Sequence, residues 1–297
     1  MRKLLTLLCV GMAMTLIYGC SDSPPTVNAP LDHESLNLVP RPEFIETRPD
    51  AEVQNAVMKA DPDYIVMLGK KPPKPPPDPP DTTDPNPNPS HKYAYIVGIS
   101  DYEGTINDLQ FCDDDAQDIK NLLQGEGFTI RMDLDRNATA DDITAGLQWL
   151  VSQAEPGDEI AFCYSGHGAK APRYGSSIIS TDLYYVTHGY VMQYFNGVDC
   201  SKKLVTLDAC VIGDFHSDTE TGTMMATASN RRSSYDAPDL NNGAWTYYYL
   251  EAANDQGLVF AEDCAEYAED GMKAWASLYR LKVDPKHTDM YSGMFDM

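Results

Sequence analysis

Short apolar runs alternate with segments of helical periodicity from residue 91 to the end of the chain. The runs are typical of buried strands, because they are short and bounded by turn residues. They occupy residues 93–99, 128–134, 159–163, 203–207 and 224–228. Apolar positions at helical spacing occupy residues 113–123, 140–151, 187–195, 245–253 and 264–281. Strands separated by helices predict an α/β fold with a mostly parallel sheet covered on both faces.

Turn and capping residues mark the ends of two of these helices. Thr139 is predicted to cap the helix that begins at residue 140, with Asp142 at the third helical position. Gly125 and Gly127 are predicted to end the helix at residues 113–123. An irregular segment is predicted between residue 168 and the helix at 187–195.

The first twenty residues have the pattern of an export signal. Arg2 and Lys3 precede an apolar stretch, which ends at Cys20. This arrangement resembles a bacterial lipoprotein signal peptide over residues 1–19, and the resemblance implies that Cys20 becomes the lipidated first residue. An ordinary secretory signal and a retained membrane anchor remain open as alternatives. The expected location is outside the cytoplasm, lipid-anchored to the cell envelope in the outer membrane or at the cell surface.

Two segments without a clear pattern follow the predicted signal. Residues 20–71 are polar and interrupted by proline, and residues 72–90 consist largely of proline. A proline-rich sequence favours an extended, semi-rigid spacer. The predicted organisation is therefore a polar N-terminal segment, a proline-rich linker and one domain over residues 91–297.

Charge and cysteine content limit the partners and the chemistry. The 297-residue chain has a formal net charge of -23, which disfavours nucleic acid and favours basic partners. Of the seven cysteines, Cys9 belongs to the signal and Cys20 to the lipidation site, which leaves an odd number. Their spacing is not that of a zinc site or a disulfide framework. A bridge between Cys200 and Cys264 remains open, and Cys163 is predicted to be a core residue.

A histidine and a cysteine each stand just beyond a predicted strand. His167 lies in Tyr-Ser-Gly-His-Gly at residues 164–168, and Cys210 ends Leu-Asp-Ala-Cys at residues 207–210. The carboxyl ends of parallel strands meet at one edge of a sheet, where ligand sites of such folds lie. An adjacent imidazole activates a thiol as a nucleophile and can protonate a leaving amine. Either residue alone is easily structural, whereas two at strand ends predict a catalytic pair.

Acyl transfer also needs backbone N–H groups for the developing oxyanion. We expect the amides of Gly168 and Cys210 to bind this oxyanion. Gly168 suits the role because a residue without a side chain lets its N–H approach closely. The sequence contains neither the Gly-x-Ser-x-Gly motif of serine α/β-hydrolases nor a P-loop. Both of those classes are therefore disfavoured.

Four separate segments occur in the order found in the caspase-like catalytic domain of metacaspases and their bacterial relatives. They are residues 93–100, 109–116, 164–168 and 207–210. On these segments, residues 92 to about 255 resemble that domain. The resemblance implies a caspase-like three-layer sandwich and a cysteine endopeptidase with His167 as the base and Cys210 as the nucleophile.

The same resemblance implies a pocket for a basic side chain, because metacaspases cleave after arginine or lysine. That pocket maps onto Cys112, Asp115, Ser165 and Asp208. Asp208 stands two residues before Cys210, on the same side of an extended chain. For Asp115 the alternative is a solvated helix N-terminus beside other aspartates.

Two features depart from the metacaspase pattern. Residues 211–213 are Val-Ile-Gly, where metacaspases usually carry His-Ser-Gly. Between the two catalytic motifs only Asp182 and Asp199 are carboxylates, whereas calcium requires several oxygen ligands. Calcium dependence is not expected on this ground, although the acidic groups at residues 113–115 and 133/135 leave calcium binding open. No other cofactor is implied.

The combined expectation is an exported, lipid-anchored cysteine endopeptidase that cleaves peptide or protein substrates after arginine or lysine. A protease of the clostripain or gingipain type shares the His-Gly…Cys arrangement and is the second enzyme hypothesis. A tethered binding or scaffold protein with an inactive caspase-like domain is the hypothesis from another class. The presence of both His167 and Cys210 speaks against it.

Overall fold

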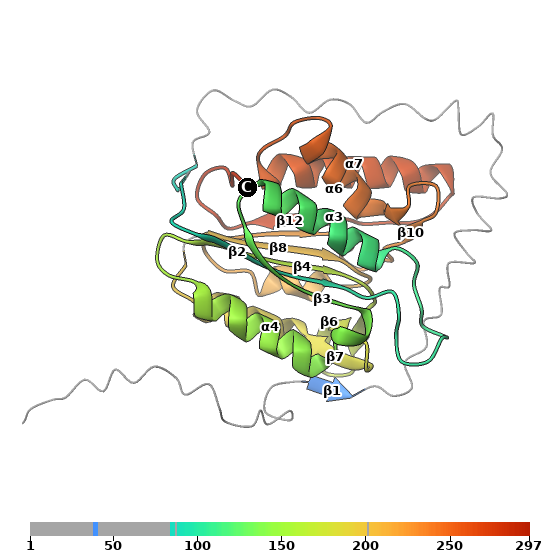
Figure 1. Ribbon diagram of the computed structural model, residues 1–297. Coiled ribbons are helices and arrows are strands. Elements are labelled where there is room, and N and C mark those ends of the chain that lie inside the picture. The colour runs from blue at the N-terminus through green and yellow to red at the C-terminus, as the bar shows by residue number, and fades with distance from the viewer. Residues whose placement is uncertain (1–37, 41–83, 87, 201) are drawn as a thin grey trace, which may run out of the picture. The chain divides into compact units, whose positions relative to one another are not determined.

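The structure, a computed structural model, describes residues 38–40, 84–86, 88–200 and 202–297. Its centre is a six-stranded sheet with the strand order β12-β9-β8-β4-β2-β3 (Figure 1). The strands are β2 (Lys92–Gly98), β3 (Thr129–Leu134), β4 (Glu159–Ser165), β8 (Lys202–Asp208), β9 (Thr223–Thr227) and β12 (Lys286–Asp289). The first five run parallel, and β12 is antiparallel to β9. The predicted mostly parallel sheet is confirmed.

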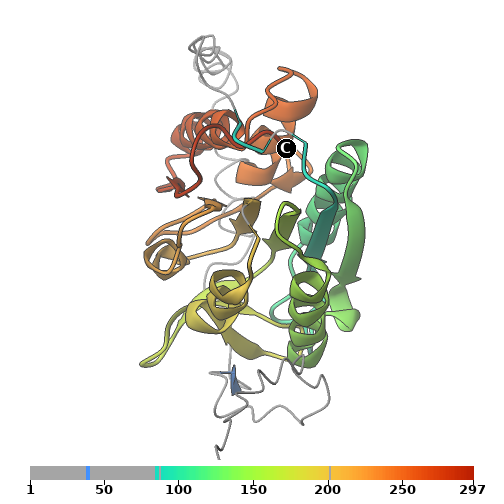
Figure 2. The same ribbon diagram turned by 90° about the vertical axis from the view of Figure 1, so that its left-hand side faces the viewer.

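Helices cover both faces of this sheet (Figure 1). One face carries α3 (Cys112–Gly125), α6 (Ala244–Asn254) and α7 (Ala261–Leu278), and the other carries α4 (Ala140–Gln153) and α5 (His188–Gly197). Successive residues of a strand point to opposite faces, so each face has its own apolar cluster. Figure 2 shows these layers from a second side. The expected three-layer sandwich is confirmed.

Local sequence explains where two helices begin. Thr139 Oγ1 accepts a hydrogen bond from Asp142 N, and Asp142 Oδ2 accepts one from Thr139 N, so the predicted cap of α4 is confirmed as a capping box. Such a cap stabilises a helix by about 1 kcal/mol. Thr187 caps α5 by accepting from Tyr190 N. Both helices therefore start where a threonine replaces the missing intrahelical acceptor.

The pattern predicts an irregular segment between β4 and α5, and this prediction is wrong. The segment forms β5 (Gly168–Ala171), β6 (Gly175–Ile179) and β7 (Tyr184–Thr187), an antiparallel sheet to which the backbone of β1 (Leu38–Pro40) adds a fourth strand. β5 and β6 have four and five residues and contain glycine, alanine or serine, so they lack the apolar run that identifies a buried strand. β7, Tyr-Tyr-Val-Thr, has only four residues and leads directly into α5.

The C-terminal half contains further short elements. The tail at residues 284–289 has no apolar pattern, yet most of it forms β12, with Lys286 opposite Thr227 of β9. A two-stranded ribbon of β10 (Asp236–Ala237) and β11 (Asn242–Gly243) follows β9. Two 3₁₀ turns complete the fold, η1 (Asp135–Asn137) and η2 (Gly213–Ser217).

The cysteines of the described residues are free and buried, so no bridge joins Cys200 to Cys264. Cys200 Sγ donates to Asp158 O, and Cys264 Sγ of α7 donates to Leu258 O in the segment before that helix. Cys163 lies in the core as predicted, and burial raises the pKa of its thiol to about 12.

A buried ion cluster closes the amino ends of β4 and β8, where Glu159 is opposite Lys202. Lys202 Nζ lies 2.7 Å from Asp84 Oδ2 and 3.3 Å from Glu159 Oε2, and Lys92 Nζ lies 3.5 Å from the same Glu159 oxygen. Tyr291 OH donates to Asp84 Oδ1. The cluster therefore joins residue 84 to two central strands and to the C-terminal tail.

Burial and pairing act in opposite directions on the acids of this cluster. Burial raises the pKa of Glu159 to about 7, against the opposing effect of Lys202 and Lys92. Burial also raises the pKa of Asp84, but hydrogen bonds from Lys202 and Tyr291 outweigh it, so the net pKa is lowered. Asp84 is thus the well-paired carboxylate of the two.

The predicted signal peptide at residues 1–19, with Cys20 after it, lies outside the described residues. So do most of the polar segment at 20–71 and most of the linker at 72–90. Within the described part of the chain, no helix is long and apolar enough to cross a membrane.

Candidate active site

His167 and Cys210 lie at the same edge of the sheet, because β4 and β8 are neighbouring parallel strands. Ser165 of β4 is opposite Asp208 of β8, so His167 and Cys210 each stand two residues beyond that pair. Gly166 N donates to Asp208 O at 3.1 Å, which continues the pairing past the strand ends. The structure thus brings the two predicted catalytic residues to adjoining turns.

Gly168 explains how closely these turns approach each other. A Cβ added to Gly168 would lie 2.2 Å from Cys210 O, 2.8 Å from Cys210 N and 3.0 Å from the Ala209 side chain. A side chain at this position would therefore push the two turns apart. The two residues predicted to supply oxyanion donors, Gly168 and Cys210, have their backbones side by side.

A carbonyl and two tyrosines hold His167 in place. His167 Nε2 lies 2.7 Å from Asn107 O. Because a carbonyl can only accept, Nε2 carries the proton of the neutral ring and Nδ1 is the acceptor nitrogen. Tyr102 OH accepts from His167 N at 2.8 Å, and Tyr164 OH donates to His167 O at 2.9 Å. A buried imidazole with a fixed orientation and a basic Nδ1 suits a general base.

The Cys210 thiol lies at a sharp bend of the backbone. Ser234 N donates to its sulfur at 3.2 Å. Val211, the next residue, has a φ of 52°, a left-handed conformation that costs a residue with a side chain about 1–2 kcal/mol. Val211 N donates to Arg232 O at 2.9 Å, and Ser176 Oγ donates to Val211 O at 2.6 Å. The Val-Ile-Gly sequence thus begins with a strained bend that its neighbours hold in place.

Asp115 is fully buried next to the strand ends. Its Oδ2 accepts from Ser165 Oγ at 2.7 Å, and its Oδ1 accepts from Gly243 N at 2.9 Å and from Asn242 Nδ2 at 3.1 Å. The side chain has no solvent exposure. The alternative of a solvated helix N-terminus is therefore wrong for Asp115.

Asp208 lies next to Asp115. Asp208 Oδ2 accepts from Thr246 N at 3.1 Å and from Thr246 Oγ1 at 2.9 Å, while Ser234 Oγ donates to Oδ1. Gly243 passes between the two acids, since a Cβ on it would lie 2.5 Å from Asp208 Oδ2 and 2.7 Å from Asp115 Oδ2. The two predicted pocket carboxylates thus form one pair.

Cys112 and a third carboxylate complete this acidic cluster. Cys112 Sγ lies 3.7 Å from Asp236 Oδ1, and Asp236 Oδ2 accepts from Gln110 N at 2.8 Å. Burial raises the pKa of the Cys112 thiol well above its usual range, and the charges of Asp236 and Asp115 add to this effect. The four residues predicted for the pocket, Cys112, Asp115, Ser165 and Asp208, are therefore gathered in one place together with Asp236.

The acid pair has no counter-ion among the residues that the structure describes. Burial raises the pKa of Asp115 well above its usual range, and the charge of Asp208 raises it further. Burial also raises the pKa of Asp208, partly offset by hydrogen bonds from Ser234 and Thr246. None of the described residues supplies a cation to either acid. A cation placed between them would favour the ionised forms.

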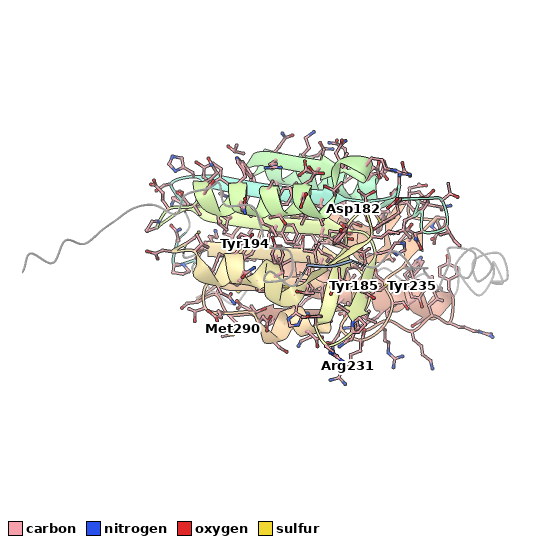
Figure 3. All side chains as sticks on the ribbon, turned by 90° about the horizontal axis from the view of Figure 1, so that it is seen from below. Asp182, Tyr185, Tyr194, Arg231, Tyr235 and Met290 are labelled. Carbon is pink, nitrogen blue, oxygen red and sulfur yellow. The ribbon has the colours of Figure 1, made fainter. Side chains whose placement is uncertain are left out.

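The acidic residues considered for calcium have other partners. Among the described residues, no group of three or more His, Cys, Asp or Glu is placed to hold a metal ion. Ser100 Oγ donates to Asp113 Oδ1, and Ser100 N donates to Asp135 Oδ1 at 2.8 Å. Asp182, labelled in Figure 3, accepts from Ala140 N at 2.9 Å at the start of α4. These carboxylates tie loops to helices.

Several residues of the site carry no signal that sequence reasoning could use. Asn107 contributes only a backbone carbonyl to His167. Ser234 and Thr246 come from segments after β9 and donate to an acid in β8. Tyr102 had a weak signal, since it is an aromatic residue in a polar stretch, three residues after the strand predicted at residues 93–99.

A thiol and an imidazole at adjoining strand ends define a cysteine-type site on an α/β sheet. Residues 91–270 match the family model described as the caspase domain. Because this match covers more than half of the chain, the chain belongs to the caspase-domain family.

Named relatives cover smaller parts of the chain. Metacaspase-1 of Mycosarcoma maydis is 36% identical over 87 residues, which are 26% of this chain and 21% of that protein. Metacaspase-1 of Saccharomyces cerevisiae is 29% identical over 153 residues, which are 45% of this chain and 35% of that protein. The chain thus spans well under half the length of these relatives.

A solved structure shares the fold across most of the chain. Caspase-1 from Spodoptera frugiperda superimposes with a TM-score of 0.58 at 13% identity, covering 73% of this chain and 94% of that chain. At this identity the similarity concerns the fold alone. It supports the three-layer architecture that brings His167 and Cys210 together.

Proposed function

We propose that this protein is a cysteine-type endopeptidase in which His167 is the general base and Cys210 the nucleophile. The observation that carries the proposal is the position of both residues two places beyond the paired ends of β4 and β8. Membership of the caspase-domain family supports it. The substrates are peptides or proteins, since the reaction is hydrolysis of a peptide bond.

In the proposed reaction, His167 Nδ1 takes the thiol proton of Cys210 and the sulfur attacks the scissile carbonyl carbon. The same proton passes to the leaving amine as the C–N bond breaks, which leaves a thioester. Water, deprotonated by the imidazole, then attacks the thioester, releases the acid and restores the thiol. The hydrogen bond from Nε2 to Asn107 O keeps the ring in one orientation through both halves.

The oxyanion of each tetrahedral intermediate would be bound by the amides of Gly168 and Cys210. Their backbones approach each other at a distance that only a glycine at position 168 permits. Preorganised amide donors of this kind contribute about 3–4 kcal/mol to acyl transfer. A Gly168→Ala variant should therefore lose activity even though both reactive side chains remain.

The proposed substrates carry arginine or lysine before the cleaved bond. Asp115 and Asp208 are buried together without a cation among the described residues, so a guanidinium or ammonium group is the missing partner. Ser165 and Cys112 stand beside them and complete the proposed pocket. Basic specificity also agrees with the net charge of -23, which attracts basic peptides.

The first test is the substitution Cys210→Ala. Purified protein is assayed with a fluorogenic peptide that ends in arginine at the cleavage point, and we expect the rate to fall by about 10⁴-fold or more. Cys264→Ala is the matched control, because that buried thiol lies in α7. The mechanism is overturned if the Cys210→Ala protein retains activity while the control behaves normally.

We also propose that the protein is exported and anchored to the cell envelope through a lipid on Cys20. The support is the sequence pattern of residues 1–20, a basic start followed by an apolar stretch that ends at cysteine. Cells fed an alkyne fatty acid should label the protein and lose the label in Cys20→Ser. Label retained in Cys20→Ser would contradict this anchor.

A further inference from the structure

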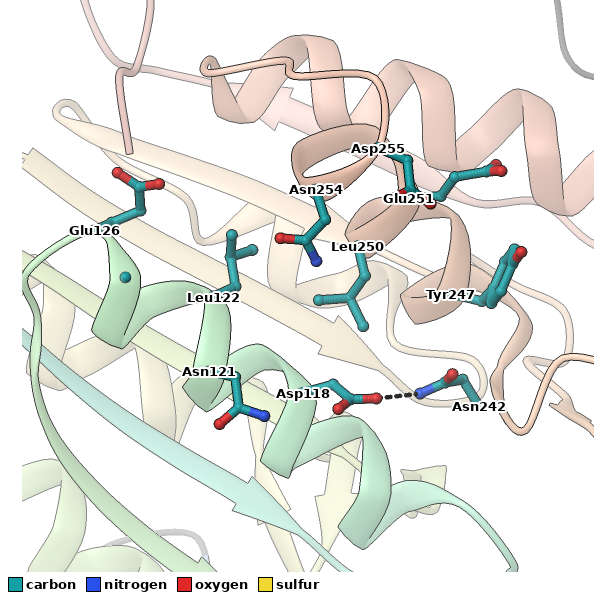
Figure 4. Close-up of a pocket in the computed structure, with 11 residues that line it drawn as sticks. Asp118, Asn121, Leu122, Glu126, Asn242, Tyr247, Leu250, Glu251, Asn254 and Asp255 are labelled. Atoms are coloured by element: carbon teal, nitrogen blue, oxygen red, sulfur yellow. Dashed lines mark hydrogen bonds between the residues drawn. The ribbon is translucent and has the colours of Figure 1, made fainter.

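A groove of about 540 Å³ lies between α3 and α6 (Figure 4). Its walls are the later turns of α3 and the outer side of α6, and neither His167 nor Cys210 lines it. A volume of this size accommodates several side chains of a bound peptide. The groove is therefore a candidate binding site apart from the catalytic pair.

The lining of the groove is strongly acidic. It includes the carboxylates of Asp118, Glu126, Glu251 and Asp255, and no lysine, arginine or histidine. The apolar side chains of Leu122 and Leu250 lie between these carboxylates (Figure 4). Lysine and arginine bury their aliphatic stems on apolar surface while the charged head group remains at a polar rim. The lining thus matches long basic side chains.

A metal ion is a poor match for this lining. No group of three or more His, Cys, Asp or Glu in the described parts of the chain is placed to hold one. The four carboxylates are therefore spread along the groove and not gathered at one point. Such spacing suits separate cationic groups along an extended peptide.

Asn242 connects the groove to the acidic pair of the active site. This side chain is only 8% exposed, and its Nδ2 donates to Asp118 Oδ2 at 3.2 Å and to Asp115 Oδ1 at 3.1 Å. Its carbonyl oxygen Oδ1 accepts no hydrogen bond from the described residues, although Asn242 lines the groove. This oxygen is open to solvent in the groove, where an ammonium or guanidinium group of a peptide can donate to it.

We propose that this groove is a secondary binding site for the lysine- or arginine-rich part of an extended peptide. As an exosite for substrates it rests on the proposed peptidase function, and it extends the preference for basic residues beyond the one at the cleavage point. The groove is adjacent to Asp115 through Asn242, so a single peptide could occupy the primary pocket and the groove together.

Binding can be tested without catalysis. The full chain carrying Cys210→Ala is titrated into a fluorescein-labelled peptide of alternating lysine and glycine, and fluorescence anisotropy gives Kd. The variant Glu126→Gln with Glu251→Gln and Asp255→Asn removes three groove charges and leaves Asp118 and Asn242 intact. We expect its Kd to rise by about fivefold to tenfold at low ionic strength, because each lost ion pair contributes a modest amount.

The control removes the same number and kind of charges elsewhere. Glu155, Glu220 and Asp270 are exposed and do not line the groove. Neutralising them to Gln, Gln and Asn changes the net charge by the same amount but should change Kd by less than about twofold, because exposed charges that do not line the groove are screened by salt. Equal effects of the two triple variants would overturn the proposal, since binding would then depend on net charge alone. Unchanged binding in the groove variant would overturn it as well.

A kinetic comparison separates this proposal from the proposed function. Two substrates share one arginyl cleavage site, and the longer one carries a lysine-rich arm. With Cys210 intact, kcat/KM should be about fivefold higher for the longer substrate than for the short one. The groove variant should lose that advantage, while its kcat/KM for the short substrate stays the same. Equal cleavage of both substrates by unaltered protein would refute the exosite alone. Absence of any cleavage would refute the peptidase, while the anisotropy assay would still decide on the groove.

Discussion

The two ends of the β4–β8 strand pair both bury carboxylates, but in opposite electrostatic surroundings. At the amino end, Asp84 and Glu159 share Lys202, and Lys92 approaches Glu159 from the side. At the carboxyl end, Asp115 and Asp208 have hydroxyl, amide and backbone donors but no cation among the described residues. The same two strands thus hold one acid cluster that is charge-balanced and one that is not.

This difference indicates which cluster stabilises the fold and which one is available to a ligand. Buried carboxylates without a counter-ion raise each other's pKa and weaken the folded state, so they persist only where another advantage offsets that cost. The unbalanced pair is beside Cys210, whose turn directly follows Asp208. A basic side chain of a peptide would convert the carboxyl end into a copy of the amino end, with two acids around one cation.

The largest expected effect comes from breaking the balanced end. Lys202→Met leaves Asp84 and Glu159 buried without their shared cation, which should lower the free energy of unfolding by about 3–5 kcal/mol. Urea denaturation of the full chain followed by circular dichroism measures this change. The preference of the folded protein for arginyl peptides should stay the same, because the carboxyl end is untouched.

Lys203→Met is the matched control for that experiment. Lys203 is the adjacent lysine, it is also buried, and its ammonium group donates to the carbonyl of Phe195 at 3.0 Å. Because none of the described carboxylates forms an ion pair with Lys203, we expect a smaller loss, of about 1–2 kcal/mol. Equal destabilisation by the two variants would mean that the amino-end cluster contributes nothing beyond lysine burial.

The second prediction concerns the unbalanced end. Asp208→Asn keeps the shape and can still bond Ser234 and Thr246, but it removes a negative charge. The ratio of kcat/KM for an arginyl peptide over a matched glutaminyl peptide should fall by about 100-fold, which corresponds to about 2.7 kcal/mol. Glu159→Gln, which neutralises a buried acid at the other end of the same strands, should leave that ratio unchanged. An unaltered ratio in Asp208→Asn would remove the pocket assignment.

The sequence pattern predicted the residues gathered at the carboxyl end of the sheet far better than those gathered at its amino end. His167, Cys210 and Asp208 follow or end apolar runs, so their placement depends on local periodicity and on the rule that parallel strands end together. The Asp84–Lys202 pair joins residues 118 positions apart, and no local pattern connects them. Asp84 moreover belongs to a proline-rich stretch predicted only as a spacer.

The acid pair illustrates the same limit within the active site. Resemblance to metacaspases marked Asp115 and Asp208 as pocket residues, but it did not indicate Asn242 or Gly243. These two come from β11 and reach Asp115 across more than a hundred residues of sequence. Turn residues such as Asn-Gly predict a bend, but they do not predict which distant residue the bend contacts. That contact depends on how α6 packs on α3.

The third prediction uses pH to compare the two ends. Burial raises the folded-state pKa of Glu159 from 4.5 to about 7, so the folded protein holds this proton more tightly than the unfolded chain. Its contribution to stability is then complete below about pH 4.5 and is lost as pH rises through about 7. A shift of this size corresponds to at most about 3.4 kcal/mol, and we expect about 2 kcal/mol after local relaxation.

The free energy of unfolding of Glu159→Gln should therefore rise relative to that of the unaltered protein as the pH increases. The difference between the two proteins should be about 2 kcal/mol more in favour of the variant at pH 8 than at pH 5. Urea titrations of both proteins at the two pH values measure this difference directly, and other titrating groups cancel because they are common to both. A difference of the opposite sign would show that Lys202 and Lys92 outweigh burial at Glu159. Both acids of the amino end, Glu159 as well as Asp84, would then be balanced by lysines, and the contrast with the carboxyl end would depend on Asp115 and Asp208 alone.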